Sequence, residues 1–207
     1  MLSCDARREV RERTLVRLRA AGWTDDVWVE VDRSTHARPQ ERQSVTSFLL
    51  LSRAVADGAD AILFLEDDLD FNRHFAHNLR RWAPLRSAAR GGHFFASLYN
   101  PTISELERRP DADCFVARSN AVYGSQAFVL ATETARFIIE HWTRVPGMQD
   151  IKMSRLAAEV TPIYYHVPSL VQHIGVSTWG GATHTACDFD PGWRAHGDPT
   201  SLPMEGA

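Results

Sequence analysis

Three consecutive carboxylates, Glu66, Asp67 and Asp68, directly follow the apolar run Ala61–Leu65. Crowded carboxylates repel one another unless a cation shares them, and their hard oxygen atoms suit a divalent metal. In an extended segment side chains alternate, so we expect Glu66 and Asp68 on one side and Asp67 on the other. The alternative is a solvated turn whose acids cap a helix beginning near Asn72. Three acids directly after a wholly apolar run favour a functional site.

The apolar run before the acids has the length and composition of a strand buried on both faces, as in a parallel sheet. Open α/β sheets bind their ligands beyond the carboxyl ends of the strands, which is where these acids lie. The flanking pattern alternates between helix and strand. Helices are predicted over 7–21, 40–57 and around 72–82, and strands at the N-terminus and over 26–32. Such alternation predicts an α/β fold with a mainly parallel central sheet flanked by helices.

The second half of the chain is less regular. Strands are expected over 92–99, 114–117, 127–130 and 163–167, and helices over 132–142 and 149–159. From Gly175 onward the sequence is rich in Gly, Thr, Ser, His and Pro, which predicts a loop-rich tail. Without a repeat or a clear linker, the 207 residues are expected to form a single domain.

The bulk composition excludes several classes of protein. The formal net charge of −3 gives no basic face for nucleic acid, so no nucleic-acid partner is expected. Cys4, Cys114 and Cys187 fit neither a zinc pattern nor a disulfide framework. No apolar stretch reads as a signal peptide or a transmembrane segment, which makes a cytoplasmic location the simplest expectation.

Two motifs carry a family resemblance. The run Leu63–Asp68 resembles the DXD-type acidic motif of nucleotide-sugar-dependent glycosyltransferases of the GT-A fold, in its Glu-Asp-Asp form. That form is found in N-acetylglucosaminyltransferases and in lipopolysaccharide-type sugar transferases. Val167–Gly175 is similar to the late Pro-Ser-Leu-x-Gln-His-x-Gly stretch of the type IV N-acetylglucosaminyltransferases. Ser3–Arg8, Val29–Asp32 and Tyr123–Ala127 resemble other parts of the family in the right order, each more weakly.

The resemblance implies one Rossmann-like GT-A domain over residues 1–207. Residues 1–100 would form the nucleotide-sugar-binding half, 101–176 the acceptor and catalytic half, and 177–207 a flexible tail or lid. The implied activity moves a sugar from a UDP-sugar donor to the hydroxyl of an acceptor, with inversion. The acceptor stays open between a glycan, a lipid-linked sugar, a protein and a small molecule.

The same resemblance assigns the metal site. Asp68 would be the direct ligand and His173 a second one, although His173 also fits a histidine that only orders its loop. Glu66 and Asp67 would contact the donor sugar and the ribose. Oxygen ligands suit Mg²⁺ or Mn²⁺, and an imidazole ligand favours Mn²⁺.

Further positions follow by resemblance. Asp150 corresponds to the catalytic base of inverting members, and its alternative role is a helix N-cap. Ser3 and Asp32 correspond to nucleotide-sugar contacts at the ends of the first two strands. Arg7 or Arg8 would contact the base or the phosphate, and the register slightly favours Arg8; solvated surface charge is the alternative for both.

Two other functions remain open at this stage. Doubly wound phosphotransferases and metal-dependent hydrolases also place acids after an apolar strand, and they need a first-strand acid and a supporting lysine. Asp5 is available, but the only lysine is Lys152, behind Asp150. The second is a GT-A-like domain that binds nucleotide or glycan without turnover. In the tail, Trp179-Gly180-Gly181, His184 and Trp193 suit either a lid or simple packing.

Overall fold

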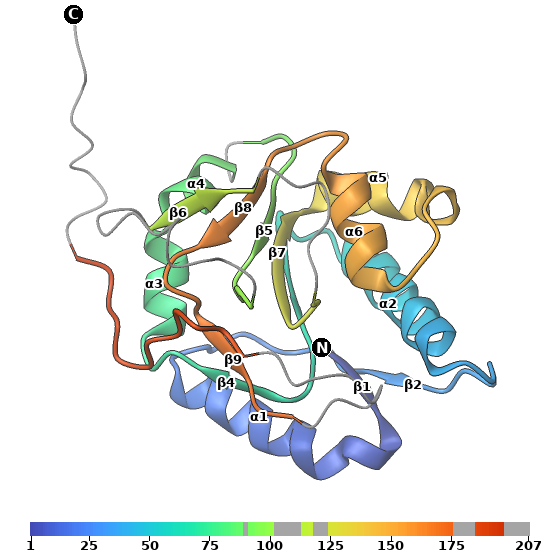
Figure 1. The fold of residues 1–207 in the computed structure, drawn as a ribbon, viewed down its shortest axis with the longest axis horizontal. Coiled ribbons are helices and arrows are strands. Elements are labelled where there is room, and N and C mark those ends of the chain that lie inside the picture. Colours follow the sequence, from blue (N-terminus) through green and yellow to red (C-terminus); the bar gives the residue numbers. More distant parts are fainter. Residues whose placement is uncertain (89–90, 102–112, 118–123, 176–184, 197–207) are drawn as a thin grey trace, which may run out of the picture.

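The computed structural model describes residues 1–88, 91–101, 113–117, 124–175 and 185–196. At its centre lies a five-stranded sheet in the order β3–β7–β5–β8–β6 (Figure 1). Its strands are β3 (Ala61–Leu65), β5 (Phe95–Ser97), β6 (Cys114–Val116), β7 (Ala127–Ala131) and β8 (Ile163–His166). Two small sheets accompany it. They pair β1 (Leu2–Cys4) with β2 (Glu30–Asp32), and β4 (Leu69–Phe71) with β9 (Val171–His173).

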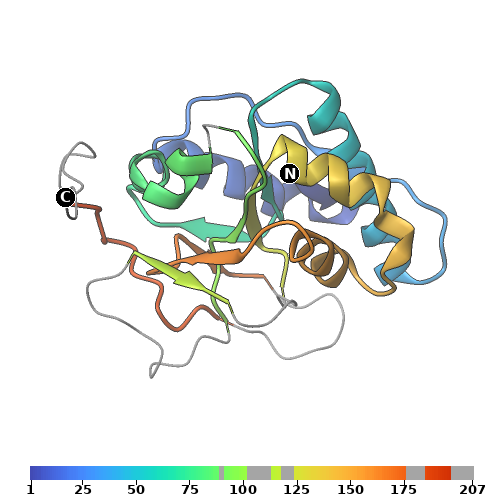
Figure 2. The same ribbon diagram turned by 90° about the horizontal axis from the view of Figure 1, so that it is seen from above.

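Helices cover both sides of this sheet. They are η1 (Asp5–Arg7), α1 (Arg8–Ala20), α2 (Pro39–Ala56), α3 (Phe75–Arg81), α4 (Ala83–Ala88), α5 (Thr132–Glu140), η3 (Trp142–Arg144) and α6 (Gln149–Ala157). In Figure 2, α2, α5 and α6 lie together, apart from α3 and α4. None of the described helices is both long and apolar enough to cross a membrane.

The burial of β3 is the feature that the sequence predicted best. Ile62 and Phe64 belong to a core shared with α2, α5 and α6, whereas Leu65 belongs to a second core shared with α1 and α3. Successive side chains of a strand point to opposite faces, so both faces of β3 are packed. The acids that follow therefore begin at the end of a rigid, doubly covered strand.

The pairing of the strands differs from the expected parallel sheet. In the central sheet β5 and β8 are parallel, but β3–β7, β5–β7 and β6–β8 are antiparallel, so the sheet is mixed. β1 and β2 form a separate parallel pair rather than joining β3. An apolar run specifies a buried strand but not its neighbour, because pairing depends on tertiary contacts.

The sequence analysis did not predict the short strands β4 and β9, which have three residues each. They pair antiparallel, with Leu69 opposite His173. Thr14 of α1 braces the start of β4, since its hydroxyl donates to the Asp67 carbonyl at 2.8 Å and accepts from the Leu69 amide at 3.2 Å. This small sheet brings the segment Val171–His173 beside the acids.

The described part of the tail, residues 185–196, forms neither helix nor strand and is held by polar contacts. Asp188 is buried and accepts from the Ser169 amide and from Asn100 Nδ2, both at 3.1 Å. The Trp193 ring packs on His166, with ring centroids 5.4 Å apart. Trp193 therefore packs the tail onto the domain, whereas Trp179, Gly180, Gly181 and His184 lie outside the described residues.

We predict that His166 contributes to acid unfolding. Its ring is 1% exposed, lies against Trp82, and hydrogen-bonds through Nδ1 to the Pro168 carbonyl at 2.7 Å. Burial lowers the pKa of His166 to about 4, below its ordinary value near 6.5. The unfolded chain therefore takes up the proton first as the pH falls. This linkage removes on the order of 3 kcal/mol of stability between about pH 6.5 and pH 4.

Urea unfolding measured from pH 4 to pH 8 tests this prediction. His166→Gln should flatten the dependence of the unfolding free energy on pH below about 6.5, whatever its effect on stability at pH 8. His36→Gln, at an exposed position, is the control and should keep the wild-type slope. An unchanged slope in His166→Gln would contradict the assignment.

Candidate functional site

The three acids lie in a bend between β3 and β4 rather than in an extended strand. Asp67 and Asp68 are 2% and 1% exposed. The expected alternation is not kept, because Asp67 and Asp68 share one partner, Arg7, whereas Glu66 turns to Ser125 and other residues. The bend thus sets two buried carboxylates around one cation.

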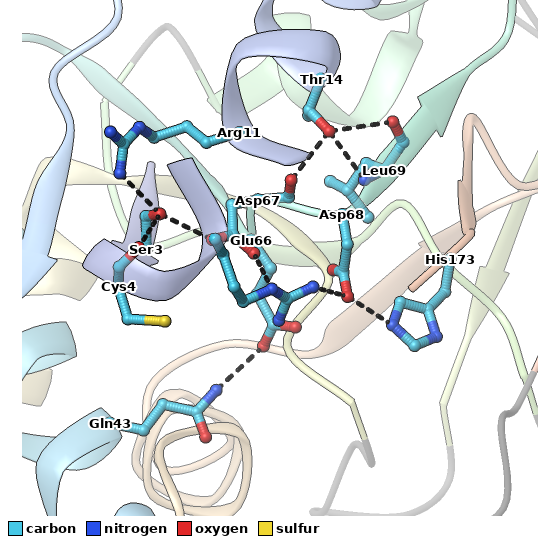
Figure 3. A network of polar contacts seen from close by, with 11 residues as sticks. Ser3, Cys4, Arg11, Thr14, Gln43, Glu66, Asp67, Asp68, Leu69 and His173 are labelled. Atoms are coloured by element: carbon cyan, nitrogen blue, oxygen red, sulfur yellow. Dashed lines mark hydrogen bonds and ion pairs between the residues drawn. The ribbon is translucent and has the colours of Figure 1, made fainter. Parts of the chain in front are cut away.

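That cation is the guanidinium of Arg7, at the end of η1. Its Nε lies 3.2 Å from Asp67 Oδ1, and its Nη2 contacts Asp68 Oδ2. The Ser3 hydroxyl donates to Asp67 Oδ2 at 2.6 Å and accepts from Arg11 at 3.0 Å (Figure 3). Ser3 and Arg7 are therefore at the acids, as the sequence predicted for nucleotide-sugar contacts.

Arg8, which the motif register favoured, lies elsewhere. Its exposed guanidinium is 3.8 Å from Glu12 on the same helix face. The 3-10 turn η1 places Arg7 toward the acids, and the first turn of α1 carries the next residue out to solvent. The sequence could not decide between Arg7 and Arg8, because the direction of each side chain depends on the residue at which α1 begins.

His173, in β9, reaches the acids from a segment more than a hundred residues away in the sequence. The β4–β9 pairing places its Nε2 2.9 Å from Asp68 Oδ2, and the Ile174 amide donates to the Asp68 carbonyl at 3.0 Å. The hydrogen bond to Asp68 raises the pKa of His173, although burial opposes the shift. Burial by itself would raise the pKa of Asp68, but the His173 hydrogen bond and the Arg7 charge outweigh it and lower that pKa.

Glu66 has hydrogen-bond partners different from those of Asp67 and Asp68. Its Oε1 accepts from the Ser125 hydroxyl and, at 3.4 Å, from Gln43 Nε2. Gln149 supports this contact, since its Nε2 donates to Ser125 Oγ at 2.7 Å. Burial and the neighbouring charge of Asp68 raise the pKa of Glu66 to about 7. Gln43 and Gln149 were missed, because an isolated glutamine on a helix gives no sequence signal.

A pocket of about 200 Å³ runs from the acids toward β2 and the start of α2. It is lined by Leu2, Ser3, Cys4, Arg7, Asp32, Pro39, Arg42, Gln43, Glu66 and Asp67. Asp32 lies at the β2 end, beside Cys4 in the β1–β2 register. Its Oδ2 accepts from Arg42 Nε at 3.1 Å, and Arg42 is a pocket residue that the sequence did not predict. The pocket thus joins predicted residues from three parts of the chain: Ser3 and Arg7, Asp32, and Glu66 with Asp67.

Asp150 lies near these residues but does not line the pocket. At the start of α6, its Oδ2 accepts from the Gly124 amide and its Oδ1 from the Ile151 amide, both at 2.8 Å. These bonds fix the carboxylate and tie the segment before β7 to α6. Met148 is the N-cap of α6 and no side chain caps the helix, so Asp150 lies in the first turn rather than at the N-cap, and its catalytic role remains a proposal.

Two features of Asp68 fit a divalent cation. Its Oδ1 is buried and has no hydrogen-bond partner among the described residues, an arrangement that is costly unless a ligand satisfies it. Gly175 also lies so close that an added Cβ would stand 1.8 Å from Asp68 Oδ2. The described residues contain no group of three or more His, Cys, Asp or Glu side chains arranged around a metal. Asp68 and His173 are the two residues here that could contribute an oxygen and a nitrogen ligand to a cation, and they could not hold it without further ligands.

We predict that Gly175→Ala disrupts this site while preserving the fold. The added methyl group must push the Asp68 carboxylate away from His173. The pKa of His173 should then fall toward its ordinary value, which NMR titration of the imidazole in EDTA would detect. Gly192→Ala is the matched control, because its Cβ would meet the flexible Arg73 guanidinium at 3.0 Å and Asp190 Oδ1 at an ordinary 3.4 Å. An unchanged His173 titration in Gly175→Ala would contradict the prediction.

Two comparisons with known proteins identified no relative of this chain. No protein-family model matches the chain, and a search of curated proteins also finds no match. The resemblance to GT-A glycosyltransferases therefore rests on the motifs and on the residues that the fold brings together around Asp68.

Proposed function

We propose that this protein is a metal-dependent glycosyltransferase that moves a sugar from a UDP-sugar to an acceptor hydroxyl with inversion. The observation that carries the proposal is the convergence of Arg7, Asp67, Asp68 and His173 beside the pocket. These residues come from η1, the β3–β4 bend and β9, and they match the motifs of the resemblance. Such a cluster of fixed charges suits a ligand that carries a diphosphate.

The pocket suggests how the donor lies. The diphosphate would occupy the end with Arg7, Asp68 and His173, where cationic groups and a metal can meet it. The nucleoside would extend toward Asp32 and Arg42, which offer a carboxylate acceptor and guanidinium donors beside the apolar Pro39 and Leu2.

Asp68 and His173 would hold the Mn²⁺ or Mg²⁺ ion, with Mn²⁺ favoured by the imidazole. When bound, the cation neutralises the charge that builds on the departing diphosphate. Arg7 would add a second positive charge at the same phosphates, since its guanidinium fork suits paired oxygen atoms. Glu66 would contact the transferred sugar together with Ser125, its hydrogen-bond partner.

Asp150 would act as the base. The acceptor oxygen attacks the anomeric carbon, the bond from that carbon to the diphosphate breaks, and the acceptor proton passes to the Asp150 carboxylate. Attack opposite the leaving group inverts the anomeric centre. Hydrogen bonds from Gly124 and Ile151 hold the carboxylate in place and leave lone pairs for the acceptor.

The phosphotransferase or hydrolase alternative finds less support. Lys152 Nζ donates to the carbonyls of Trp142 and Val145, at 3.0 and 2.5 Å, rather than to the acids. Asp5 is exposed. The expected first-strand acid and supporting lysine are therefore not gathered with Glu66, Asp67 and Asp68.

We predict that UDP binding requires both a divalent cation and Asp68. In calorimetric titration with Mn²⁺, wild-type protein should bind UDP, and EDTA or Asp68→Asn should weaken binding roughly 100-fold, as expected for the loss of about 3 kcal/mol from a charged contact. Asp70→Asn, two residues away with a half-exposed side chain, is the control and should bind normally. Absence of UDP binding to the wild type under any condition would overturn the proposed function.

We further predict that Asp150→Asn separates binding from turnover. Its UDP affinity should match the wild type, whereas hydrolysis of its best UDP-sugar should fall by about 10²–10⁴-fold, as expected for loss of a general base. Glu133→Gln, at the exposed start of α5, controls for removal of an acid near a helix N-terminus. Equal hydrolysis rates in Asp150→Asn and wild type would restrict Asp150 to its structural hydrogen bonds with Gly124 and Ile151.

A further inference from the structure

Arg7 occupies the side of Asp68 that faces the pocket. Its guanidinium contacts Asp68 Oδ2, the same oxygen that receives the His173 hydrogen bond, and it also reaches Asp67. The carboxylate side chains of Asp67 and Asp68 are 3% and 2% exposed, whereas that of Arg7 is 21% exposed and lines the pocket. The acids therefore already have a built-in counterion, one whose far side remains open to a ligand.

This arrangement changes how strongly a free cation is attracted. Two bare buried carboxylates would draw a divalent ion strongly, because nothing else neutralises their charge. Here an incoming ion that takes over Asp68 Oδ2 must displace Arg7 from it, which leaves the guanidinium with Asp67 as its remaining carboxylate partner. Asp68 Oδ1 has no hydrogen-bond partner in the described part of the chain, so the carboxylate keeps capacity for another ligand and the obstacle is the charge of Arg7.

A diphosphate removes that obstacle. It brings several negative oxygen atoms into the pocket, and the planar guanidinium can bind two of them at once. Arg7 can then exchange Asp68 for phosphate without leaving the pocket. The Asp68 carboxylate, no longer paired with Arg7, and the bound phosphates can then both contact a cation.

We propose that Arg7 makes cation binding conditional on the diphosphate, so that a divalent cation and a nucleoside diphosphate enter this site as a pair. The inference deepens the proposed function, on which it rests for the identity of the nucleotide. By linkage, each ligand must raise the affinity of the other by the same factor, typically 5–150-fold for coupled sites. Mn²⁺ alone and UDP alone therefore both bind weakly.

Replacement of Arg7 should change the affinities for the two ligands in opposite directions. In Arg7→Gln the acids lose their counterion, so Mn²⁺ alone should bind about tenfold more tightly or better, a gain equivalent to about 1.4 kcal/mol. UDP in EDTA should bind more weakly, because a phosphate contact is gone. The mutual enhancement of Mn²⁺ and UDP should shrink. A purely structural role would instead weaken both, and a simple phosphate contact would leave Mn²⁺ alone unaffected.

The experiment measures free Mn²⁺ by electron paramagnetic resonance, and nucleotide binding by calorimetry. Wild type, Arg7→Gln and Arg7→Lys are compared with Arg11→Gln, which removes a neighbouring charge that contacts Ser3 and neither acid. Far-ultraviolet circular dichroism and thermal unfolding check the fold of each variant. Should Arg7→Gln fail to fold, Arg7→Lys keeps the charge but loses the fork, and should show weaker coupling with little change in Mn²⁺ affinity.

Two results would overturn the inference: tight Mn²⁺ binding by the wild type that UDP does not improve, or an Arg7→Gln variant whose Mn²⁺ affinity stays the same or falls. Inorganic pyrophosphate serves as a second probe. Coupling of Mn²⁺ to pyrophosphate without UDP binding would uphold the role of Arg7 and reject the proposed donor. Absence of coupling with either diphosphate would reject the role of Arg7 even where UDP binds.

Discussion

Buried negative charge at the end of β3 is the constraint on which the rest of this structure depends. A rigid strand, packed on both faces, delivers Asp67 and Asp68 into a bend where water reaches them little. Charges so buried are stable only when paired and hydrogen-bonded. Arg7, Ser3 and His173 meet that requirement from separate parts of the chain.

The surrounding elements are arranged to supply those partners. α1 begins beside the acids and braces the bend through Thr14, and the β4–β9 pair brings in His173. Gly175 follows at once, where its missing side chain leaves room for the Asp68 carboxylate. Neutralisation of Asp68 and the proposed binding of a metal–diphosphate pair would use the same residues, which would couple stability to function at this site.

Local sequence patterns predicted the individual elements well and their pairing less well. The strand Ala61–Leu65, the helices over 40–57 and 149–159, and the placement of acids beyond a buried strand are present in the structure. The mainly parallel sheet is mixed instead, and β4 and β9 were unforeseen. Strand order and the pairing of β4 with β9 depend on contacts between distant segments, which a local pattern does not contain.

The sequence by itself determined the junction of a buried strand with three acids, because that feature is contiguous and its burial follows from composition alone. It also singled out Asp32 and His173 by motif. Only the tertiary structure decided that Arg7 rather than Arg8 neutralises the acids, and that Gln43 and Gln149 support Glu66 directly and through Ser125. The reason is physical: helix register and the β4–β9 pairing set which side chains meet, and neither is encoded within one local segment.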